Sequence, residues 1–278
     1  MNLRPLIATA LVGVLAVGAA TATAAPAPAK QRSPAFAPAA TATVTPGVQT
    51  ITGPGQCTAN FVFTDGTGAV YLGQSAHCAS TGGSTATNGC LAGSLPLGTP
   101  VRVTGAAKPG TMVYSSWIAM QQVAEKDANA CRYNDFALIR LDPSDVGRTN
   151  PSVPVFGGPV ALDSDGTSSG EQVVSYGNSS LRFGLRDTSP KRGVSLGDSA
   201  QGWTHTVYTA TPGIPGDSGS AVLDGSGRAI GTLSTVAIAP YPLSNGVSDL
   251  AHEIAYARSH GLPGLTLVPG TEKFRGFL

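Results

Sequence analysis

Charged and aromatic side chains are scarce in this chain of 278 residues. Asp, Glu, Lys and Arg make up 12% of it, aromatic residues make up 6%, and the formal net charge is +1. Soluble domains carry about 25% charged residues. A surface with few charges that is rich in Gly, Ser and Thr suits a secreted protein better than a cytosolic one. The near-neutral balance provides no basic surface for a nucleic acid or an anionic membrane. The basic cluster Lys191-Arg192, with Arg182 and Arg186 nearby, is expected to be a solvated loop.

Cysteine is also sparse, and it never occurs as CxxC, which argues against a zinc ribbon. The four cysteines are Cys57, Cys78, Cys90 and Cys131. They allow three disulfide connectivities, and pairing in sequence order gives Cys57–Cys78 and Cys90–Cys131. Two disulfides indicate an oxidising compartment. The acidic loop at residues 163–166 is too short for a calcium loop and is expected to be a turn, so we expect neither a metal ion nor a cofactor.

A long apolar run occurs at the N-terminus, and no second run of spanning length follows. Arg4 precedes the run, residues 5–20 form it, and Ala22-Thr23-Ala24 offers a cleavage site. This order predicts a signal peptide over residues 1–24; the alternative is an uncleaved anchor, which the short run disfavours. Residues 25–47, rich in Ala, Pro and Thr, are expected to be a disordered pro-segment or tether. We therefore expect a secreted, extracellular protein without membrane contact after cleavage.

From residue 48 onward, short β-branched runs alternate with turn signals. Asp-Gly and Gly-Ser-Gly turns join several runs into hairpins, which indicates an all-β fold; residues 110–123 are among the predicted strands. Residues 248–261 have helical spacing, with Ser248 at the start and Gly261 at the end, and a short last strand is expected after them. The proline-rich residues 151–154 divide this region into two β units, at residues 48–150 and 151–278.

The stretch GDSGS at residues 216–220 raises the question whether Ser218 is a nucleophile. A serine hydroxyl is a weak nucleophile unless an adjacent base takes its proton, and that base needs a third group to orient it. Gly216 has no Cβ, so its N–H and that of Ser218 could point to one spot as an oxyanion hole. A buried Asp217 would need a cationic partner.

The four histidines differ as candidate bases. His77 follows an apolar run and precedes Cys78, whose disulfide would hold the imidazole rigidly. His205 alternates within a strand and is expected to be a partly buried structural residue, whereas His252 and His260 are expected at the surface of the helix. His77 is therefore the preferred base.

Among the aspartates, Asp135 directly precedes a strand predicted at residues 136–140. Its alternative role is to cap a turn together with Asn134. Asp163 and Asp165 lie in open Gly/Ser loops, which do not suit a buried orienting carboxylate. Asp135 is the preferred partner of the base.

Three blocks of the sequence together resemble the trypsin- and chymotrypsin-like serine peptidases. QSAHC (residues 74–78) resembles the family's TAAHC block, and NDFALIRL (residues 134–141) resembles its NDIALLKL block. GDSGS resembles its GDSGG block, with a serine for the last glycine as in bacterial members. The three blocks follow the order His, Asp, Ser, as in the family, and the resemblance covers residues 57–239. It points to the secreted bacterial, actinobacterial-type branch.

The resemblance implies a fold and a set of roles. The fold is two packed six-stranded antiparallel β-barrels with a short C-terminal helix. His77 would be the general base and acid, Asp135 its orienting group and Ser218 the nucleophile, with the N–H groups of Gly216 and Ser218 forming the oxyanion hole. Cys57–Cys78 matches a family disulfide, and Cys90–Cys131 then pairs by elimination.

GTLSTVA (residues 231–237) is similar to the family's GIVSWGS, which implies that Ser234 supports Asp135 and that a specificity pocket lies beside it. The implied pocket residues are Pro212, Gly213, Thr235, Val236 and Ala237. No acid stands at the pocket floor, so cleavage after Lys or Arg is not expected. Val236 replaces a glycine that keeps the pocket open, which favours small or apolar side chains.

The family's IVGG terminus is missing, so Asp217 is expected to pair with an arginine instead of a new N-terminus. Whether a pro-segment must be removed is left open. The main hypothesis is a monomeric secreted serine endopeptidase that acts on protein or peptide substrates through an acyl-enzyme. The alternative is a catalytically silent protease fold that serves as an extracellular binding module. An α/β-hydrolase esterase is disfavoured because its order is Ser, Asp, His.

Overall fold

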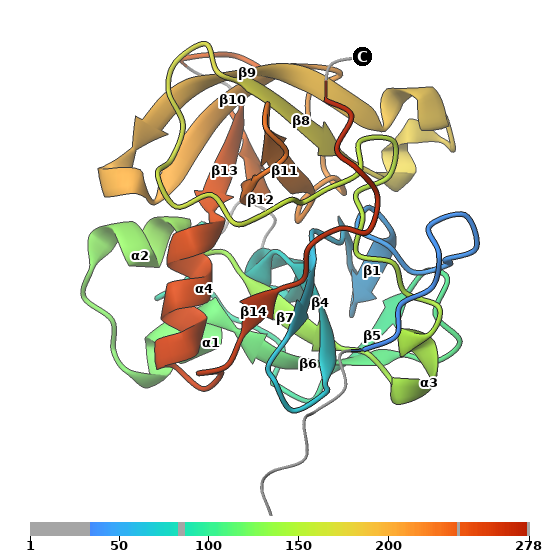
Figure 1. Cartoon of the computed structure of the whole chain (residues 1–278). Helices are drawn as coiled ribbons and strands as arrows, with labels where there is room; N and C mark the ends of the chain where they lie inside the picture. Colours follow the sequence, from blue (N-terminus) through green and yellow to red (C-terminus); the bar gives the residue numbers. More distant parts are fainter. Residues whose placement is uncertain (1–33, 83–86, 238–239, 277–278) are drawn as a thin grey trace, which may run out of the picture. The chain divides into compact units, whose positions relative to one another are not determined.

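The structure, a computed structural model, describes residues 34–82, 87–237 and 240–276. Strands from the second half of the chain form a closed antiparallel barrel in the order β10-β13-β12-β11-β8-β9 (Figure 1). These strands are β8 (Gln172–Tyr176), β9 (Pro190–Ser199), β10 (Thr204–Ala210), β11 (Ala221–Asp224), β12 (Ala229–Val236) and β13 (Asn245–Asp249). A cluster of buried aliphatic side chains packs within it: Val173, Val207, Val222, Ile230, Leu233 and Val247. The predicted C-terminal barrel is confirmed.

An eight-stranded antiparallel sheet forms the other β unit, in the order β14-β3-β4-β7-β6-β5-β1-β2. Its strands are β1 (Gln49–Thr52), β2 (Gly55–Thr58), β3 (Val62–Thr64), β4 (Val70–Gln74), β5 (Pro100–Val103), β6 (Gly110–Ser115), β7 (Ala137–Arg140) and β14 (Thr266–Leu267). Strands β2 and β3 lie near opposite ends of this order, yet only residues 59–61 separate them in the chain. The two ends of the sheet are therefore close together, and the sheet is curled. The predicted N-terminal six-stranded barrel is therefore found as an antiparallel sheet of eight strands, seven from the first half of the chain and β14 from the C-terminal segment.

Short helices connect the strands. They are α1 (Ser116–Gln122), α2 (Ala128–Tyr133), α3 (Pro143–Val146) and α4 (Leu250–Ser259), with 3₁₀ turns η1 (Ala76–Ala79), η2 (Ser180–Arg182), η3 (Arg186–Thr188) and η4 (Ala200–Gly202). The strand predicted over residues 110–123 is only half right, because β6 ends at Ser115 and α1 follows. Trp117 and Met120, three positions apart on α1, are both buried, so tertiary packing favours the helix there.

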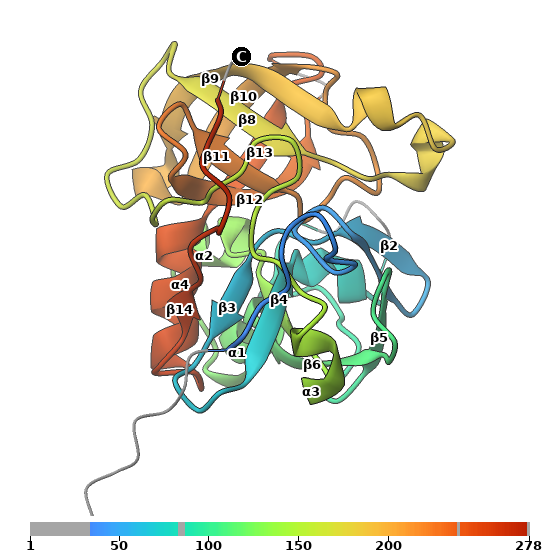
Figure 2. The ribbon, with the colours of Figure 1, turned by 45° about the vertical axis from the view of Figure 1, so that its right-hand side comes forward.

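Helix α4 is the predicted C-terminal helix. Its N-cap is Asp249, one residue after the expected Ser248, and the Asp249 carboxylate accepts from the N–H of His252. Figures 1 and 2 show α4 standing beside the first β unit, and the chain then returns to pair β14 with β3. The segment after residue 151 therefore contributes to both β units.

Residues 34–47 lie in the segment predicted to be disordered, but the structure places them against the first β unit. The N–H of Ala37 donates to the carbonyl of Thr149 at 2.8 Å, and the fully buried Val44 forms a parallel bridge with Thr149. The prediction of disorder is wrong for this part, because partners distant in sequence satisfy its backbone. The predicted signal peptide and residues 25–33 lie outside the described residues. Within the described ranges, no helix has the length and apolar character needed to cross a membrane.

Candidate active site

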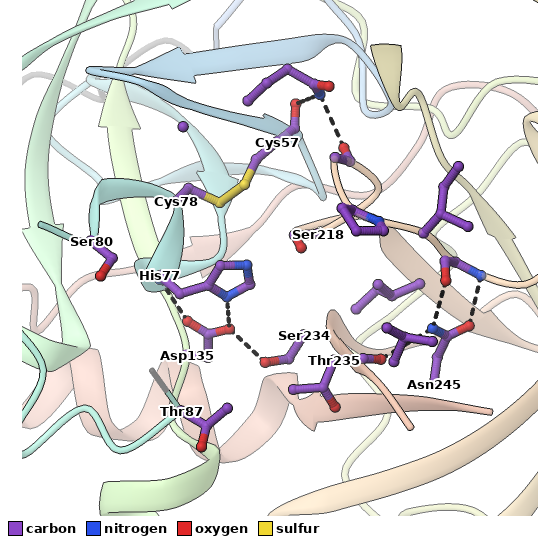
Figure 3. Close-up of a pocket in the computed structure, with 18 of the residues that line it drawn as sticks. Cys57, His77, Cys78, Ser80, Thr87, Asp135, Ser218, Ser234, Thr235 and Asn245 are labelled. Atoms are coloured by element: carbon purple, nitrogen blue, oxygen red, sulfur yellow. Dashed lines mark hydrogen bonds and ion pairs between the residues drawn. A yellow bond between two sulfur atoms is a disulfide. The ribbon is translucent and has the colours of Figure 1, made fainter. Parts of the chain in front are cut away.

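A cleft of about 650 Å³ is lined by residues from both β units. The first unit contributes His77, Asp135 and the Cys57–Cys78 disulfide, and the second contributes Ser218 and Ser234 (Figure 3). The structure thus brings the three sequence blocks to one place, although Asp135 and Ser218 are far apart in the chain.

His77 lies on η1, directly after β4. The Cys57–Cys78 disulfide links the next residue to β2, and the N–H of His77 donates to Asp135 Oδ1 at 2.8 Å. The backbone of His77 is therefore held from two sides. The second disulfide, Cys90–Cys131, also has the predicted pairing.

The His77 imidazole and the Asp135 carboxylate form a close pair. His77 Nδ1 lies 2.6 Å from Asp135 Oδ2, and the hydroxyl of Ser234 donates to the same oxygen at 2.6 Å. The side chain of His77 is 23% exposed and that of Asp135 is 6% exposed. With Nδ1 facing Asp135, Nε2 is the ring nitrogen left for a substrate or a nucleophile.

Burial and charge act in opposite directions on this pair. Burial disfavours the imidazolium, but the charge of Asp135 and its hydrogen bond outweigh burial and raise the pKa of His77. Burial likewise opposes ionisation of Asp135, yet attraction to His77, with hydrogen bonds from His77 and Ser234, lowers the pKa of this carboxyl. The pair is suited to accept a proton at His77 while Asp135 stays ionised.

Ser218 lies in the turn between β10 and β11. Its carbonyl accepts from the N–H of Thr58 at 2.8 Å, and the N–H of Gly219 donates to the carbonyl of Leu233 at 2.7 Å. Within the part of the chain that the structure describes, Ser218 Oγ has no hydrogen bond to the His77 imidazole. Hydrogen bonds of this kind are often long in proteins without substrate.

Gly216 and Ser218 both line the cleft, and neither N–H has a hydrogen-bond acceptor among the described residues. Gly216 has φ +94°, a conformation that favours glycine. A Cβ at this position would lie 2.6 Å from Gln56 Oε1 and 2.8 Å from the hydroxyl of Ser179. Glycine is required here, and two free donors border the cleft next to Ser218.

Asp217 is fully buried and pairs with two cations. Its Oδ2 lies 2.5 Å from Arg182 Nη2 and 3.0 Å from Lys191 Nζ. Burial opposes the charge of Asp217, but the hydrogen bond and charge of Arg182 and the charge of Lys191 lower the pKa of the carboxyl. An arginine partner was expected. The expectation of a solvated loop is wrong for Lys191, which is fully buried at the start of β9, and for Arg182, whose side chain is 10% exposed.

The implied specificity pocket is only partly assembled as expected. Gly213, Thr235 and Val236 line the cleft, whereas Pro212 and Ala237 are not among its lining residues. The carbonyl of Pro212 instead accepts from Arg182 Nη2 at 3.0 Å, so this residue belongs to the support of Asp217. Ala237 donates its N–H to the carbonyl of Ser244 at 2.8 Å.

Asn245 is a cleft residue that the sequence did not single out. Its Oδ1 accepts from the N–H of Gly213 at 2.8 Å, and its Nδ2 donates to the carbonyls of Gly213 and Thr235 at 3.2 and 3.1 Å. The amide therefore bridges the two walls of the pocket (Figure 3). No local signal in the sequence distinguishes this asparagine from one in an ordinary turn.

His205 and Glu253 are buried ionisable groups that lie outside the cleft. His205 is fully buried, as a structural histidine, between Asp198 at 2.5 Å and Asp249 at 3.0 Å. Glu253 on α4 is also fully buried, and Thr232 donates to its Oε2 at 3.0 Å. Burial, together with the charge of Asp135, raises the pKa of Glu253 well above its usual value.

The described residues contain one group with the spacing of metal ligands, formed by Cys57, His77 and Cys78. Both cysteine sulfurs are consumed by the disulfide, so this group does not fit a metal ion.

Comparison with known proteins gives a fold. No family model matches the chain, and no curated protein matches its sequence. Among solved structures, Protease A of Thermobifida fusca is similar, with a TM-score of 0.51 and 16% identity over 82% of this chain and 99% of the other. A glutamic-acid-specific serine protease, described as using a histidine triad in substrate binding, has a TM-score of 0.50 and 16% identity over 81% of this chain and 100% of the other. The fold is therefore that of the chymotrypsin-like serine proteases.

Proposed function

We propose that this protein is a secreted serine endopeptidase that hydrolyses peptide bonds through Ser218, His77 and Asp135. The observation that carries the proposal is the His77–Asp135 pair, which shares one cleft with Ser218 and with two unpaired backbone N–H groups. These are the parts that acyl transfer requires: a nucleophile, an oriented base and donors for an oxyanion.

In the first half of the proposed reaction, Ser218 Oγ attacks the peptide carbonyl while its proton passes to His77 Nε2. The carbonyl oxygen becomes an oxyanion that accepts from the N–H groups of Gly216 and Ser218. The C–N bond then breaks as His77 Nε2 gives its proton to the leaving amine, and an ester on Ser218 remains. Asp135 stays ionised throughout and stabilises the imidazolium.

In the second half, water attacks the ester and gives one proton to His77. The carbonyl oxygen again becomes an oxyanion in the same site. The intermediate releases the carboxylic acid, and the proton on His77 returns to Ser218 Oγ. Both halves use the same groups, so no cofactor enters the reaction.

The pocket chemistry supports a small, uncharged side chain on the acyl side of the cleaved bond. Gly213, Thr235, Val236 and Asn245 carry no charge, and the Asn245 amide spans the two pocket walls. A Lys or Arg side chain would find no carboxylate there, and burying it unpaired would be costly. We propose protein or peptide substrates with small or apolar residues at this position.

Two disulfides support export to an oxidising compartment, as the predicted signal peptide does. We propose that the protein acts outside the cell, as a monomer.

The test is the variant S218A. We expect kcat to fall about 10⁶-fold with the fold intact, because the nucleophile is lost. Activity on fluorescent casein and circular dichroism measure the two properties.

Covalent labelling separates an enzyme from a silent binding module. A phosphonofluoridate should add to the wild type at Ser218, detected by mass spectrometry, and should not add to S218A. A folded wild type that neither labels nor cleaves casein would overturn the proposal in favour of the binding module.

A further inference from the structure

The peptide group between Pro215 and Gly216 is held from behind by a serine hydroxyl. The Pro215 carbonyl accepts from Ser179 Oγ at 2.5 Å, and Ser179 is 3% exposed. In a trans peptide the C=O and the N–H point in opposite directions. A hydroxyl bound to the Pro215 carbonyl therefore directs the Gly216 N–H away from Ser179.

The peptide group between Asp217 and Ser218 has the same arrangement. The Asp217 carbonyl accepts from Ser220 Oγ at 2.5 Å, and Ser220 is fully buried. The N–H on the opposite end of this peptide is that of Ser218. Each of the two peptides with an unpaired N–H at the cleft thus has a buried serine hydroxyl on its carbonyl.

The turn at residues 214–217 could exist in two forms. The N–H of Asp217 donates to the carbonyl of Ile214 at 2.8 Å, and the positive φ of Gly216 after Pro215 identifies a type II turn. A type I turn also accepts proline at its second position, and it differs by a rotation of the central peptide through about 180°. In the type I form, the Pro215 carbonyl would replace the Gly216 N–H at the cleft.

Ser179 is placed to favour the type II form. Its Oγ accepts from the N–H of Leu181 at 3.1 Å, which leaves its single proton for the Pro215 carbonyl. A hydrogen bond to a carbonyl also polarises the peptide and makes its N–H a better donor. In the type I form this buried hydroxyl would lose its acceptor, which is costly.

We propose that Ser179 and Ser220 are positioning residues for the oxyanion hole, each orienting one donor peptide through its carbonyl. The expected effect on kcat rests on the proposed function. The orientation of the two peptide groups by Ser179 and Ser220 does not depend on that function. Of the two serines, Ser179 is expected to matter more for the orientation of its peptide. The Asp217 carbonyl also accepts from the N–H of Ser220 at 3.0 Å, so it keeps a partner when the Ser220 hydroxyl is removed.

The variants S179A, S179T and S220A test this proposal. Loss of an oxyanion donor costs about 10²–10³ in kcat. In S179A we expect the 215–216 peptide to be rotated in most molecules but not in all, so kcat should fall by about 10–10². KM should change little, because the donor acts on the transition state. S179T should restore most of the activity, and S220A should lose less than S179A. Kinetics on a succinyl-Ala-Ala-Pro-Ala p-nitroanilide measure these values.

A matched control is T149V, which removes a buried hydroxyl that donates to the carbonyl of Asp145 at 2.9 Å, outside the cleft. It should leave kcat near the wild-type value. Crystal structures of the wild type and S179A report the orientation of the 215–216 peptide, whether or not the protein cleaves peptides.

Each outcome is decisive. A rotated or mixed 215–216 peptide in S179A supports the inference, and it does so even for a wild type that proves inactive, which would sink only the proposed function. An unrotated peptide in S179A overturns the inference, whether kcat falls or not.

Discussion

The two sides of the cleft are held by different kinds of interaction. On the side of the first β unit, a disulfide and backbone hydrogen bonds hold His77, and the carboxylate of Asp135 meets it directly. On the side of the second unit, the turn that carries Ser218 depends on a buried carboxylate, Asp217, with two cations around it. A disulfide holds the backbone of His77, whereas ion pairs of Asp217 hold the turn that carries Ser218. Removing the disulfide and removing the ion pairs should therefore have different consequences.

The largest effect is expected for D217N. This change leaves Lys191 and most of Arg182 buried without an anion, and breaking such a buried pair costs about 3–5 kcal/mol. Because Asp217 lies between Gly216 and Ser218, activity should fall with stability. Urea unfolding and kcat/KM on the same preparation measure both.

The control for D217N is D142N, which removes a surface ion pair between Asp142 and Lys108. It should leave the urea midpoint and kcat/KM unchanged. A D217N protein with the wild-type midpoint and activity would show that charge does not hold the nucleophile turn.

The next effect separates the two disulfides. Removing either pair, in C57S/C78S or in C90S/C131S, should lower the free energy of unfolding by about 2–4 kcal/mol. Activity should fall more in C57S/C78S, because Cys78 adjoins His77. Urea unfolding and kcat/KM at a temperature where both variants are folded give the comparison. Equal losses of kcat/KM in the two variants would contradict a positioning role for Cys57–Cys78.

The smallest effect concerns Glu253, which lies behind the site on α4. Burial raises its pKa, so the folded protein holds the proton more tightly than the unfolded chain. Its contribution to stability is therefore full below the usual glutamate pKa, and it is lost as the pH rises through the raised pKa. E253Q, which keeps the neutral form, should remove this loss.

Urea unfolding of the wild type and E253Q at a series of pH values checks the prediction. E253A, which also leaves a cavity, should be less stable at every pH. If the wild type and E253Q lose stability in parallel as the pH rises, Glu253 does not titrate in the way that its burial requires.

Much of the site could be predicted from short stretches of sequence. His77 beside Cys78, Asp135 before β7, and Ser218 after Gly216 each depend on residues adjacent in the chain, and the structure brings these stretches into one cleft. Lys191 and Asn245 could not be predicted in the same way. Lys191 stands in a basic stretch that suggests a solvated loop. Its burial depends on an ion pair with Asp217, which lies in the turn between β10 and β11. Asn245 acts on Gly213, 32 residues away.

The fold, like the site, was predicted correctly where it depends on adjacent residues and incorrectly where it depends on distant ones. Turn residues and β-branched runs predicted the all-β class and the helix at α4. They failed at α1, where the burial of Trp117 and Met120 decides for helix, and at residues 34–47, where Thr149 supplies the partner that composition cannot reveal.

The sequence by itself determined what depends on neighbours in the chain: the strands, the Gly216 turn and the placing of His77 next to a cysteine. The contacts themselves depend on the tertiary structure: Asp135 meets the imidazole of His77, 58 residues away, and Ser234 meets the same carboxylate. The sequence indicated these pairings only through the family resemblance, and it did not indicate that Lys191 is the second cation beside Asp217. The reason is physical. Backbone conformation is set largely by adjacent residues, whereas burial and electrostatic pairing depend on which distant segments exclude water from one another.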